Sequence, residues 1–305
     1  MNKSHDGVSI VIPVYNSSRY IEDTIRSVKS SCLDICYEVI IVDDVSDDFE
    51  DLSAILSEYE FVTLIVKEGK SNASVSRNIG IQNARFDYVF LLDADDLYSP
   101  EYIKHRVELM RSNKHSLYFG AYNSLDPNGV KKPHVSFYDG SDMRDYLFLK
   151  NGDIRTSTIS INKKFHKGTM FDEKQGKHQD WGFGIKCFNN NESIYYDPTP
   201  LINICSGRHF QMSGKMNIDA SKYFLNEYLQ DEKYYASFIN MHYIKAIIQA
   251  DRTALMYFNS VLDTCDLSLL FKIKYYILKL STVDVFFGCT VFVLRKIKKL
   301  RSGYI

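Results

Sequence analysis

Three carboxylates stand within four positions directly behind an apolar run, in the segment Phe90-Leu91-Leu92-Asp93-Ala94-Asp95-Asp96. The apolar run is typical of a buried strand, and the carboxylates would emerge together at its carboxyl end. Like charges this close repel one another, and burial strengthens the repulsion, so a positive group is expected among them. A divalent cation that bridges to a phosphate is the first candidate, because hard cations take carboxylate oxygens. The alternative is an acidic turn that caps the next helix.

Strand and helix patterns alternate four times in the first part of the chain, and the opening carboxylates follow the fourth strand. The strands are continuous apolar runs, which are typical of a parallel sheet covered on both faces. Ser99-Pro100 is typical of a helix start, with an N-cap followed by proline at the first helical position. The predicted strands are residues 8–16, 38–42, 61–66 and 88–92, and the predicted helices contain Ile21, Ile25 and Val28, then Leu52, Ile55 and Leu56, then residues 72–84, then Ile103, Val107 and Met110.

The carboxyl ends of three predicted strands carry polar or acidic residues and should meet at one edge of the sheet, where ligands of such folds bind. They are Pro13-Val14-Tyr15-Asn16, Asp43-Asp44 and the acidic cluster. The first turn contains no GxGxxG, and Leu64 stands where a P-loop ending in Gly69-Lys70-Ser71 would need its first glycine. Phosphates are therefore expected to be held by carboxylates and a metal ion, not by a glycine cradle.

The second half is predicted to be loop-rich, with short strands at 116–122, 158–161 and 194–196 that complete the sheet, and to become helical near Ser221. Residues 267–301 contain eight basic residues and one acid, and Val283–Leu294 is mostly apolar but too short to span a bilayer. This pattern indicates an interfacial helix at an anionic membrane surface. The alternative is a terminal core helix with a solvated basic end.

Composition is that of an ordinary globular protein, with 45% apolar and 25% charged residues and a net charge of -1, so nothing points to nucleic acid. The six cysteines form no CxxC pair, and residues 1–7 lack the apolar segment of a secretory signal. We therefore expect a cytoplasmic protein with free thiols, placed by its C-terminal helix at the inner face of the membrane.

Several motifs of the chain, in the order in which they occur, resemble those of glycosyltransferase family 2. Members of this family are inverting enzymes with the GT-A fold. The resemblance covers roughly residues 8–215. The matching segments are Ser9–Asn16 and Glu38–Asp44 for the first two strands, Ser76–Gly80 for A-R-N-x-G, Asp93–Asp96 for the DxD motif, and Phe171-Asp172-Glu173 with Gln179-Asp180-Trp181 for F-D-E and E-D-W.

The resemblance implies an α/β protein with the GT-A fold, in which helices flank a mostly parallel central sheet and a C-terminal helical extension follows. We expect a glycosyltransferase domain over residues 1–215, with a nucleotide-binding half (1–112) and an acceptor half (113–215), and a helical region over 216–305. The implied reaction moves a sugar, with inversion, from a nucleoside-diphosphate sugar, here expected to be a UDP-sugar. The expected acceptor is a hydroxyl of a glycan or lipid-linked molecule in cell-surface polysaccharide synthesis.

Residue roles follow from the same resemblance. Tyr15 would stack on the base and Asp44 would accept a hydrogen bond from it. Arg77 would lie near the base or the diphosphate. Asp93 would bind the ribose and Asp95 would coordinate Mn²⁺ or Mg²⁺. The remaining expected contacts to the nucleotide sugar are Pro13, Val14 and Ala94.

Asp180 would act as the general base. The metal ion would neutralise the charge that develops on the leaving group, so that no protein general acid is needed. An R-x-H sequence often completes the metal site of the family, and Gly207-Arg208-His209 matches it with a spacing that differs by one, so His209 is either a metal ligand or a structural histidine. The Glu of E-D-W is Gln179 here, which leaves open a catalytically weak sugar-nucleotide-binding module. A nucleotidyltransferase is a further alternative, although its basic glycine-rich loop is absent.

Overall fold

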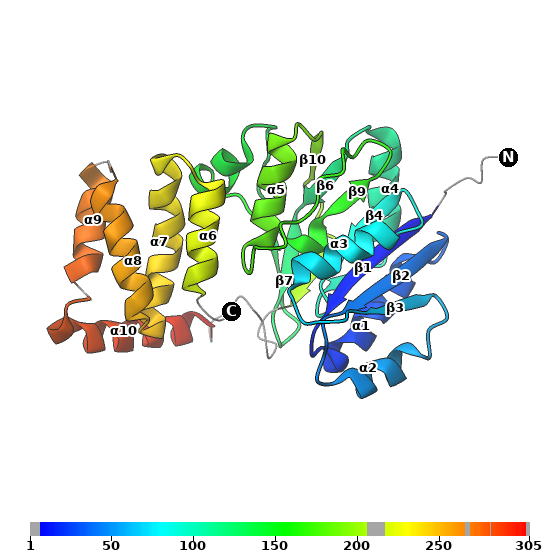
Figure 1. The fold of residues 1–305 in the computed structure, drawn as a ribbon, viewed down its shortest axis with the longest axis horizontal. Helices are drawn as coiled ribbons and strands as arrows, with labels where there is room; N and C mark the ends of the chain where they lie inside the picture. Colours follow the sequence, from blue (N-terminus) through cyan, green and yellow to red (C-terminus); the bar gives the residue numbers. More distant parts are fainter. Residues whose placement is uncertain (1–6, 206–216, 266–268, 281, 303–305) are drawn as a thin grey trace. The chain divides into compact units, whose positions relative to one another are not determined.

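The computed structural model describes residues 7–205, 217–265, 269–280 and 282–302. Within these ranges the chain forms two compact units, which we describe separately. Unit 1 comprises residues up to 147 together with the described part of 151–209, and unit 2 comprises 148–150 and the described residues beyond 210. Figure 1 shows strands and helices in unit 1 and helices in unit 2.

A seven-stranded sheet in the order β10-β6-β9-β4-β1-β2-β3 forms the centre of unit 1. All neighbouring pairs are parallel except those that involve β9, which is antiparallel to β4 and β6. The predicted mostly parallel α/β sheet is thus confirmed. The strands are β1 (Val8–Val14), β2 (Tyr37–Asp43), β3 (Val62–Val66), β4 (Tyr88–Leu91), β6 (Leu117–Gly120), β9 (Ser160–Asn162) and β10 (Ile194–Asp197).

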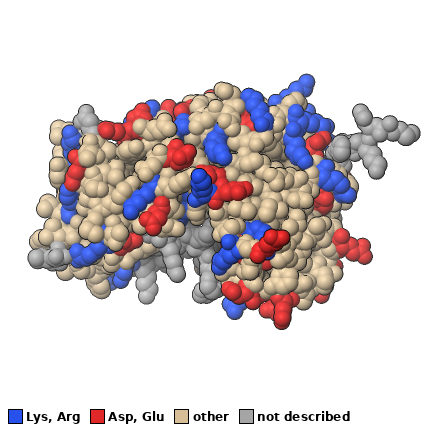
Figure 2. Space-filling view, viewed as in Figure 1, with Lys and Arg blue, Asp and Glu red and all other residues tan. Residues whose placement is uncertain are grey.

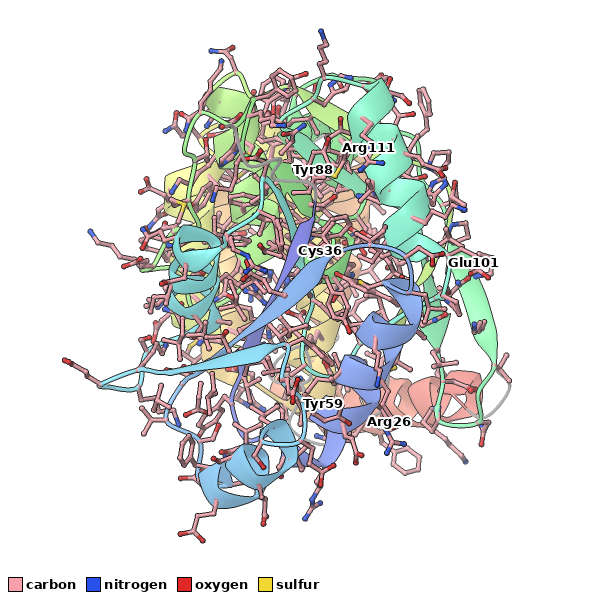
Figure 3. The ribbon with its side chains drawn as sticks, turned by 90° about the vertical axis from the view of Figure 1, so that its right-hand side faces the viewer. Arg26, Cys36, Tyr59, Tyr88, Glu101 and Arg111 are labelled. Carbon is pink, nitrogen blue, oxygen red and sulfur yellow. The ribbon has the colours of Figure 1, made fainter. Side chains whose placement is uncertain are left out.

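Alternate side chains of β1 point to opposite faces of this sheet, and helices cover both faces. Ile10 and Ile12 belong to a core that also takes apolar side chains from α1 (Ser18–Ser31), α2 (Phe49–Leu56) and α4 (Tyr102–Ser112). On the other face α3 (Ala73–Asn83) packs against Val11; α3 lies on one side of the sheet and α1 and α4 on the other (Figure 3). A Cβ on Gly80 of α3 would lie 2.2 Å from Val11 Cγ1, so this position needs glycine for helix and strand to pack this closely.

The predicted strands and helices of the first half are present, but the start of the fourth helix differs from the prediction. Ser17 occupies the N-cap of α1 without capping it, because its hydroxyl donates to Tyr15 O and Asp48 Oδ2 accepts from Ser18 N at 2.8 Å. The fourth helix begins at Tyr102, not at Ser99-Pro100. The reason is that the chain first forms β5 (Leu97–Tyr98), and the Ser99 N–H is bonded to Leu201 O.

A second, four-stranded sheet in the order β5-β11-β7-β8 extends the later half of unit 1. The single strand predicted over 116–122 is two strands in different sheets, β6 and β7 (Tyr122–Leu125). They separate at Gly120, where a Cβ would lie 2.2 Å from Asp197 O of β10. The other elements of this half are β8 (Lys131–His134), a π-helical turn (Asp145–Leu149) that runs across the boundary of the two units, a 3-10 turn (Thr156–Thr158), α5 (Gln179–Asn189) and β11 (Ile202–Cys205).

Unit 2 is helical in its described residues, as the sequence predicts for this region. Its core contains the fully buried rings of Phe224, Phe238 and Phe258. Asn217, Asp231 and Asp251 each accept a backbone N–H at the start of a helix, which explains why the helices begin there. The helices are α6 (Ile218–Tyr228), α7 (Glu232–Gln249), α8 (Arg252–Thr264), α9 (Leu269–Leu280) and α10 (Asp284–Ser302).

Among the helices that the structure describes, none has the length and apolar content that crossing a membrane requires. Acidic and basic side chains are interspersed over the visible face of each unit (Figure 2). No face seen there carries a broad field of one charge.

Candidate active site

The carboxyl ends of β1, β2 and β4 meet at one edge of the parallel sheet. The register pairs Val14 with Asp43, and the Asp44 N–H donates to Val14 O at 2.8 Å. β4 pairs with β1 only as far as Val11, so the chain after Leu91 is released beside this edge. The geometry brings together the three polar strand ends that the sequence singles out.

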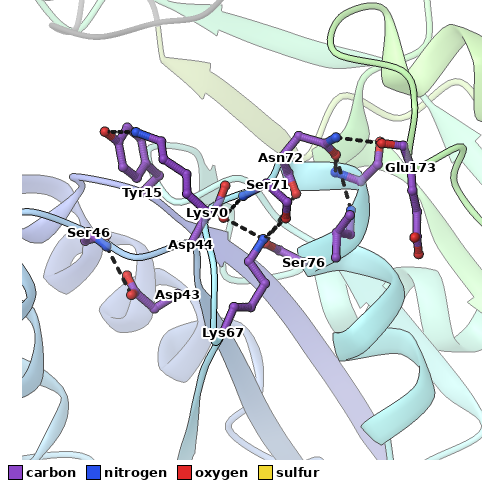
Figure 4. A network of polar contacts seen from close by, with 12 residues as sticks. Tyr15, Asp43, Asp44, Ser46, Lys67, Lys70, Ser71, Asn72, Ser76 and Glu173 are labelled. Carbon is purple, nitrogen blue, oxygen red and sulfur yellow. Dashed lines mark hydrogen bonds and ion pairs between the residues drawn. The ribbon is translucent and has the colours of Figure 1, made fainter.

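Tyr15 is partly exposed, and a lysine covers its ring. The Lys70 ammonium lies 3.7 Å from the ring centroid and donates a hydrogen bond to the Tyr15 hydroxyl (Figure 4). This hydrogen bond is the main reason that the pKa of Lys70 is raised. A planar ring that already binds a cation on one face is a surface on which a nucleobase can stack, provided that the lysine moves.

Asp44 is buried and its carboxylate is already engaged. Lys67 Nζ lies 2.6 Å from Asp44 Oδ1, and the Ser71 N–H donates to the same oxygen at 2.7 Å (Figure 4). The segment 67–71 therefore supplies partners to both Tyr15 and Asp44. In the sequence, Gly69-Lys70-Ser71 resembles only the end of a P-loop.

Arg77 joins the end of β4 to the start of α5. It is buried, its Nη2 donates to Asp93 Oδ1 and its Nη1 donates to Gln179 Oε1, both at 2.7 Å. Gln179 Nε2 in turn donates to Gln175 O at 2.9 Å. One guanidinium thus fixes the first acid of the DxD segment relative to the helix that carries Asp180.

The neighbouring residues of the A-R-N-x-G segment explain why the F-D-E segment lies here. Asn78 donates to Phe171 O and accepts from Phe171 N, and it also donates to Glu173 Oε1 at 3.0 Å. Asn72 caps α3 through its side chain and donates to Glu173 O at 2.7 Å. These bonds hold the segment before α5 against α3.

The three acids of the cluster have separate environments. Asp93 and Asp95 are partly exposed, whereas Asp96 is buried and turned inward. Ser157 Oγ donates to Asp96 Oδ2, and the Cys205 N–H donates to Asp96 Oδ1 at 2.9 Å. Burial, followed by the negative charges of Asp93 and Asp95, raises the pKa of Asp96 well above its usual range. Asp96 therefore ties the strand end to two distant segments.

None of the three acids is the N-cap of the following helix, whose N-cap is Glu101. The turn-cap alternative is therefore wrong. Nothing in the sequence distinguishes Asp96 from its neighbours, since its partners are 61 and 109 residues away.

The donors at this edge fit a hard divalent cation. Asp93 and Asp95 offer carboxylate oxygens at the end of β4, and Mg²⁺ sites commonly use one or two carboxylates together with substrate phosphates. Within the described part of the chain, no three acidic, histidine or cysteine side chains converge as a metal-ligand set. His209, the expected further ligand, lies outside the described residues.

Asp180 lies in the first turn of α5 and is partly buried. The N-cap of this helix is His178, whose backbone is left-handed, with φ of 59°. Burial raises the pKa of Asp180 to about 6; the Asp153 charge adds to this, and the Arg155 and Arg77 charges oppose it. A carboxylate with a pKa near neutrality can take up a proton in a reaction at physiological pH.

The other expected contact residues have these positions. Pro13 and Val14 are the last residues of β1, and Ala94 is buried with its carbonyl bonded to Thr24 Oγ1 at 2.9 Å. No sequence motif indicates Lys67, Asp153 or Arg155. Lys67 pairs with Asp44 and Asp153 accepts from Trp181, and only the fold brings these partners together.

The model of the family described as Glycosyl transferase family 2 matches residues 9–182. This match covers more than half of the chain, so the chain belongs to glycosyltransferase family 2.

Curated relatives agree with this family. An uncharacterized glycosyltransferase of Rickettsia bellii is 32% identical over 216 residues, which cover 68% of this chain but 31% of the relative, so the chain spans about a third of that protein. The amylovoran biosynthesis glycosyltransferase AmsB of Erwinia amylovora is 30% identical over 206 residues, covering 64% of this chain and 68% of the relative. The poly(ribitol-phosphate) beta-N-acetylglucosaminyltransferase TarP of Staphylococcus aureus is 30% identical over 174 residues, covering 55% of this chain and 51% of the relative.

The fold agrees as well. The crystal structure of S. aureus TarS 1-349 in complex with UDP-GlcNAc superposes with a TM-score of 0.56 at 18% identity, covering 78% of this chain and 72% of that chain. The predicted GT-A architecture is confirmed by this match.

Proposed function

We propose that the protein is a metal-dependent, inverting glycosyltransferase that moves a sugar from a UDP-sugar to a hydroxyl of a glycan or lipid-linked acceptor in cell-surface polysaccharide synthesis. The observation that carries the proposal is the Arg77 bridge, because one buried side chain holds both Asp93 at the donor end and Gln179 beside the base. The TarS structure, whose fold this chain shares, holds UDP-GlcNAc, and the names of TarP and AmsB refer to poly(ribitol-phosphate) and to amylovoran biosynthesis.

The proposed donor site uses residues from three strand ends. The uracil ring stacks on Tyr15 once Lys70 has moved away, and Asp44 accepts a hydrogen bond from the base. Pro13 and Val14, the last residues of β1, support the turn that carries Tyr15. Lys67 remains paired with Asp44 and holds the Asp44 carboxylate in place.

The rest of the donor contacts the end of β4. Asp93, held by Arg77, binds the ribose next to Ala94, and Asp95 and His209 hold Mn²⁺ or Mg²⁺. When bound, the ion supplies Lewis-acid stabilisation of the diphosphate leaving group. Arg77 adds a fixed positive charge near that group.

Asp180 performs the proton transfer in this proposal. It takes the proton of the acceptor hydroxyl while the hydroxyl oxygen attacks the anomeric carbon from the face opposite the diphosphate. The bond from the anomeric carbon to the diphosphate oxygen breaks with its electron pair, so the configuration inverts. Because its pKa is about 6, Asp180 is mostly ionised at neutral pH and can act as the base.

A nucleotide-sugar screen tests the donor assignment. We expect a UDP-sugar to raise the melting temperature of the full-length protein in the presence of Mn²⁺, because a ligand of the native state stabilises by mass action. EDTA or Asp95→Ala should reduce this shift, whereas Asp34→Asn, which changes an exposed carboxylate, should not. Binding without any transfer would instead favour the sugar-nucleotide-binding module. No response to any nucleotide sugar would contradict the proposal.

We further propose that α10 contacts the cytoplasmic face of the membrane. Its buried side chains Phe287 and Val291 belong to unit 2, as the terminal-core alternative expects, while Phe286, Phe292 and Val293 are more than half exposed. These outward residues, together with the exposed Arg295 and Lys296, are available to anionic lipid.

Cell fractionation tests this proposed contact. Phe292→Ser with Val293→Ser should move the protein from the membrane to the soluble fraction and leave the core face of α10 intact. Deleting Ser281–Ile305 should have the same effect but also removes Phe287 and Val291. Leu33→Ser, at an apolar residue of unit 1 that is 80% exposed, is the control. Unchanged fractionation of the double variant would contradict membrane contact through this face.

A further inference from the structure

Two charged residues that the proposed mechanism does not use, Asp153 and Arg155, lie beside the start of α5. Asp153 accepts three hydrogen bonds. Tyr122 Oη and Arg155 Nε donate to its Oδ2 at 2.8 and 2.7 Å, and Trp181 Nε1 donates to its Oδ1 at 3.3 Å. The Asp153 carboxylate therefore connects β7, the segment before the 3-10 turn, and the first turn of α5.

Trp181 directly follows Asp180, and its backbone contacts the Asp180 carboxyl group. Asp180 Oδ1 accepts from the Trp181 N–H at 3.0 Å. The indole N–H donates to Asp153, and the His178 ring stacks on the indole at 5.1 Å between centroids with an interplanar angle of 18°. His178 also has the left-handed backbone from which α5 begins. The first turn of α5 is thus held by contacts outside the helix.

Asp153 and Arg155 also place charges near Asp180 from outside α5. The cations are Arg155 and Arg77, and the nearby anion is Asp153. Within α5 the Trp181 N–H also favours the ionised carboxylate, and burial opposes it. Arg155 binds Asp153. Its guanidinium carbon lies 5.7 Å from the centroid of the Tyr122 ring.

We propose that Asp153 and Arg155 are positioning residues that orient Asp180 through Trp181 and set the pH at which it takes up a proton. The inference rests on the proposed function in one respect, namely that Asp180 is the base. The bonds of Asp153 to Arg155 and Trp181 do not depend on that assignment. They predict opposite effects for the two charges, which a purely structural role would not produce.

The test is a pH titration of Asp180 in the full-length protein by ¹³C NMR of its aspartate carboxyl groups, with the resonance assigned by its loss in Asp180→Asn. Removing a nearby cation disfavours the carboxylate, so Arg155→Gln should raise the midpoint, by about one pH unit. Asp153→Asn keeps an oxygen that can accept from Trp181 but removes the negative charge, so the midpoint should fall. Lys164→Gln, which breaks the exposed pair with Asp87 at 3.4 Å, should leave it unchanged.

The indole resonance provides a readout of position, because Trp181 is the only tryptophan of the chain. Its N–H signal should move in Asp153→Ala, where the acceptor is lost, and much less in Asp153→Asn. Midpoints that stay at the wild-type value, or that move in the same direction in Arg155→Gln and Asp153→Asn, would overturn the proposal. An indole signal that is unaffected by Asp153→Ala would overturn the orienting role.

Activity separates this proposal from the proposed function. The acid limb of kcat/KM should follow the NMR midpoints, upward in Arg155→Gln and downward in Asp153→Asn. If the wild type transfers no sugar while the midpoints still separate, the proposed function fails and the positioning role stands. If transfer occurs with the same acid limb in all variants, the positioning role fails and the function stands.

Discussion

Asp180→Asn should stabilise the protein above pH 6 although it removes the proposed base. In the folded protein the pKa of Asp180 is raised from 3.8 to about 6, mainly by burial, so folding disfavours the ionised carboxylate. A group with a raised acidic pKa has no effect on stability below its unfolded pKa and destabilises fully above its folded pKa. The amide of asparagine has nearly the same shape but carries no charge, so folding does not destabilise it in this way. Its oxygen can still accept the Trp181 N–H.

The size of the effect follows from the shift. A rise of about two units corresponds to about 3 kcal/mol at pH values above 6. Because Asp180 is only partly buried, solvent screening reduces this figure, and we expect about 1–2 kcal/mol. For a unit of this size, that corresponds to a melting temperature higher by roughly 2–8 °C.

The assay is thermal unfolding of the wild type and Asp180→Asn from pH 4 to pH 8. The difference in melting temperature should be near zero at pH 4, develop between pH 4 and 6, and level off above pH 6 to 7. Asp34→Asn, at an exposed carboxylate, is the matched control and should show no such step. An unchanged or lower melting temperature of Asp180→Asn at pH 7.5 would refute the reasoning, as would an offset that is equal at pH 4 and pH 7.5.

Three other substitutions test single contacts. Asp96→Ala should destabilise unit 1 by about 2–4 kcal/mol in chemical unfolding, because two buried donors lose their acceptor. Lys70→Ala should tighten UDP binding severalfold in calorimetry, since the nucleotide no longer has to displace a cation from the Tyr15 ring; weaker binding would instead give Lys70 a role on the diphosphate. Arg77→Lys should lower kcat/KM at least tenfold, because a lysine cannot bind Asp93 and the helix start together, and wild-type kinetics would contradict the bridge.

The first half of the fold could be predicted because each of its four predicted strands is a continuous apolar run of sufficient length. The 160–162 strand is only three residues long, and its antiparallel direction depends on partners at 88–90 and 117–118 that no local pattern reveals. The two-residue strand Leu97–Tyr98 displaced the predicted helix start for the same reason.

The residues of the candidate site also differ in whether the sequence can predict them. Arg77, Asp93 and Asp180 are carried by motifs, so the sequence alone identifies them. Lys67 and Asp153 are not, because their roles arise from partners 23 to 31 positions away, such as Asp44 for Lys67 and Trp181 for Asp153. Contacts of this kind become visible only when the sheet has brought the segments together.

The most direct test of the central claim is donor binding and turnover measured side by side in wild type and Asp180→Asn. Full-length protein, Mn²⁺, a panel of UDP-sugars and a membrane fraction as acceptor source would be used, with UDP release and incorporated sugar as readouts. The account predicts unchanged donor affinity in Asp180→Asn and a turnover that falls by about 10²–10⁴-fold, as expected for a general base. Full transfer by Asp180→Asn would contradict it.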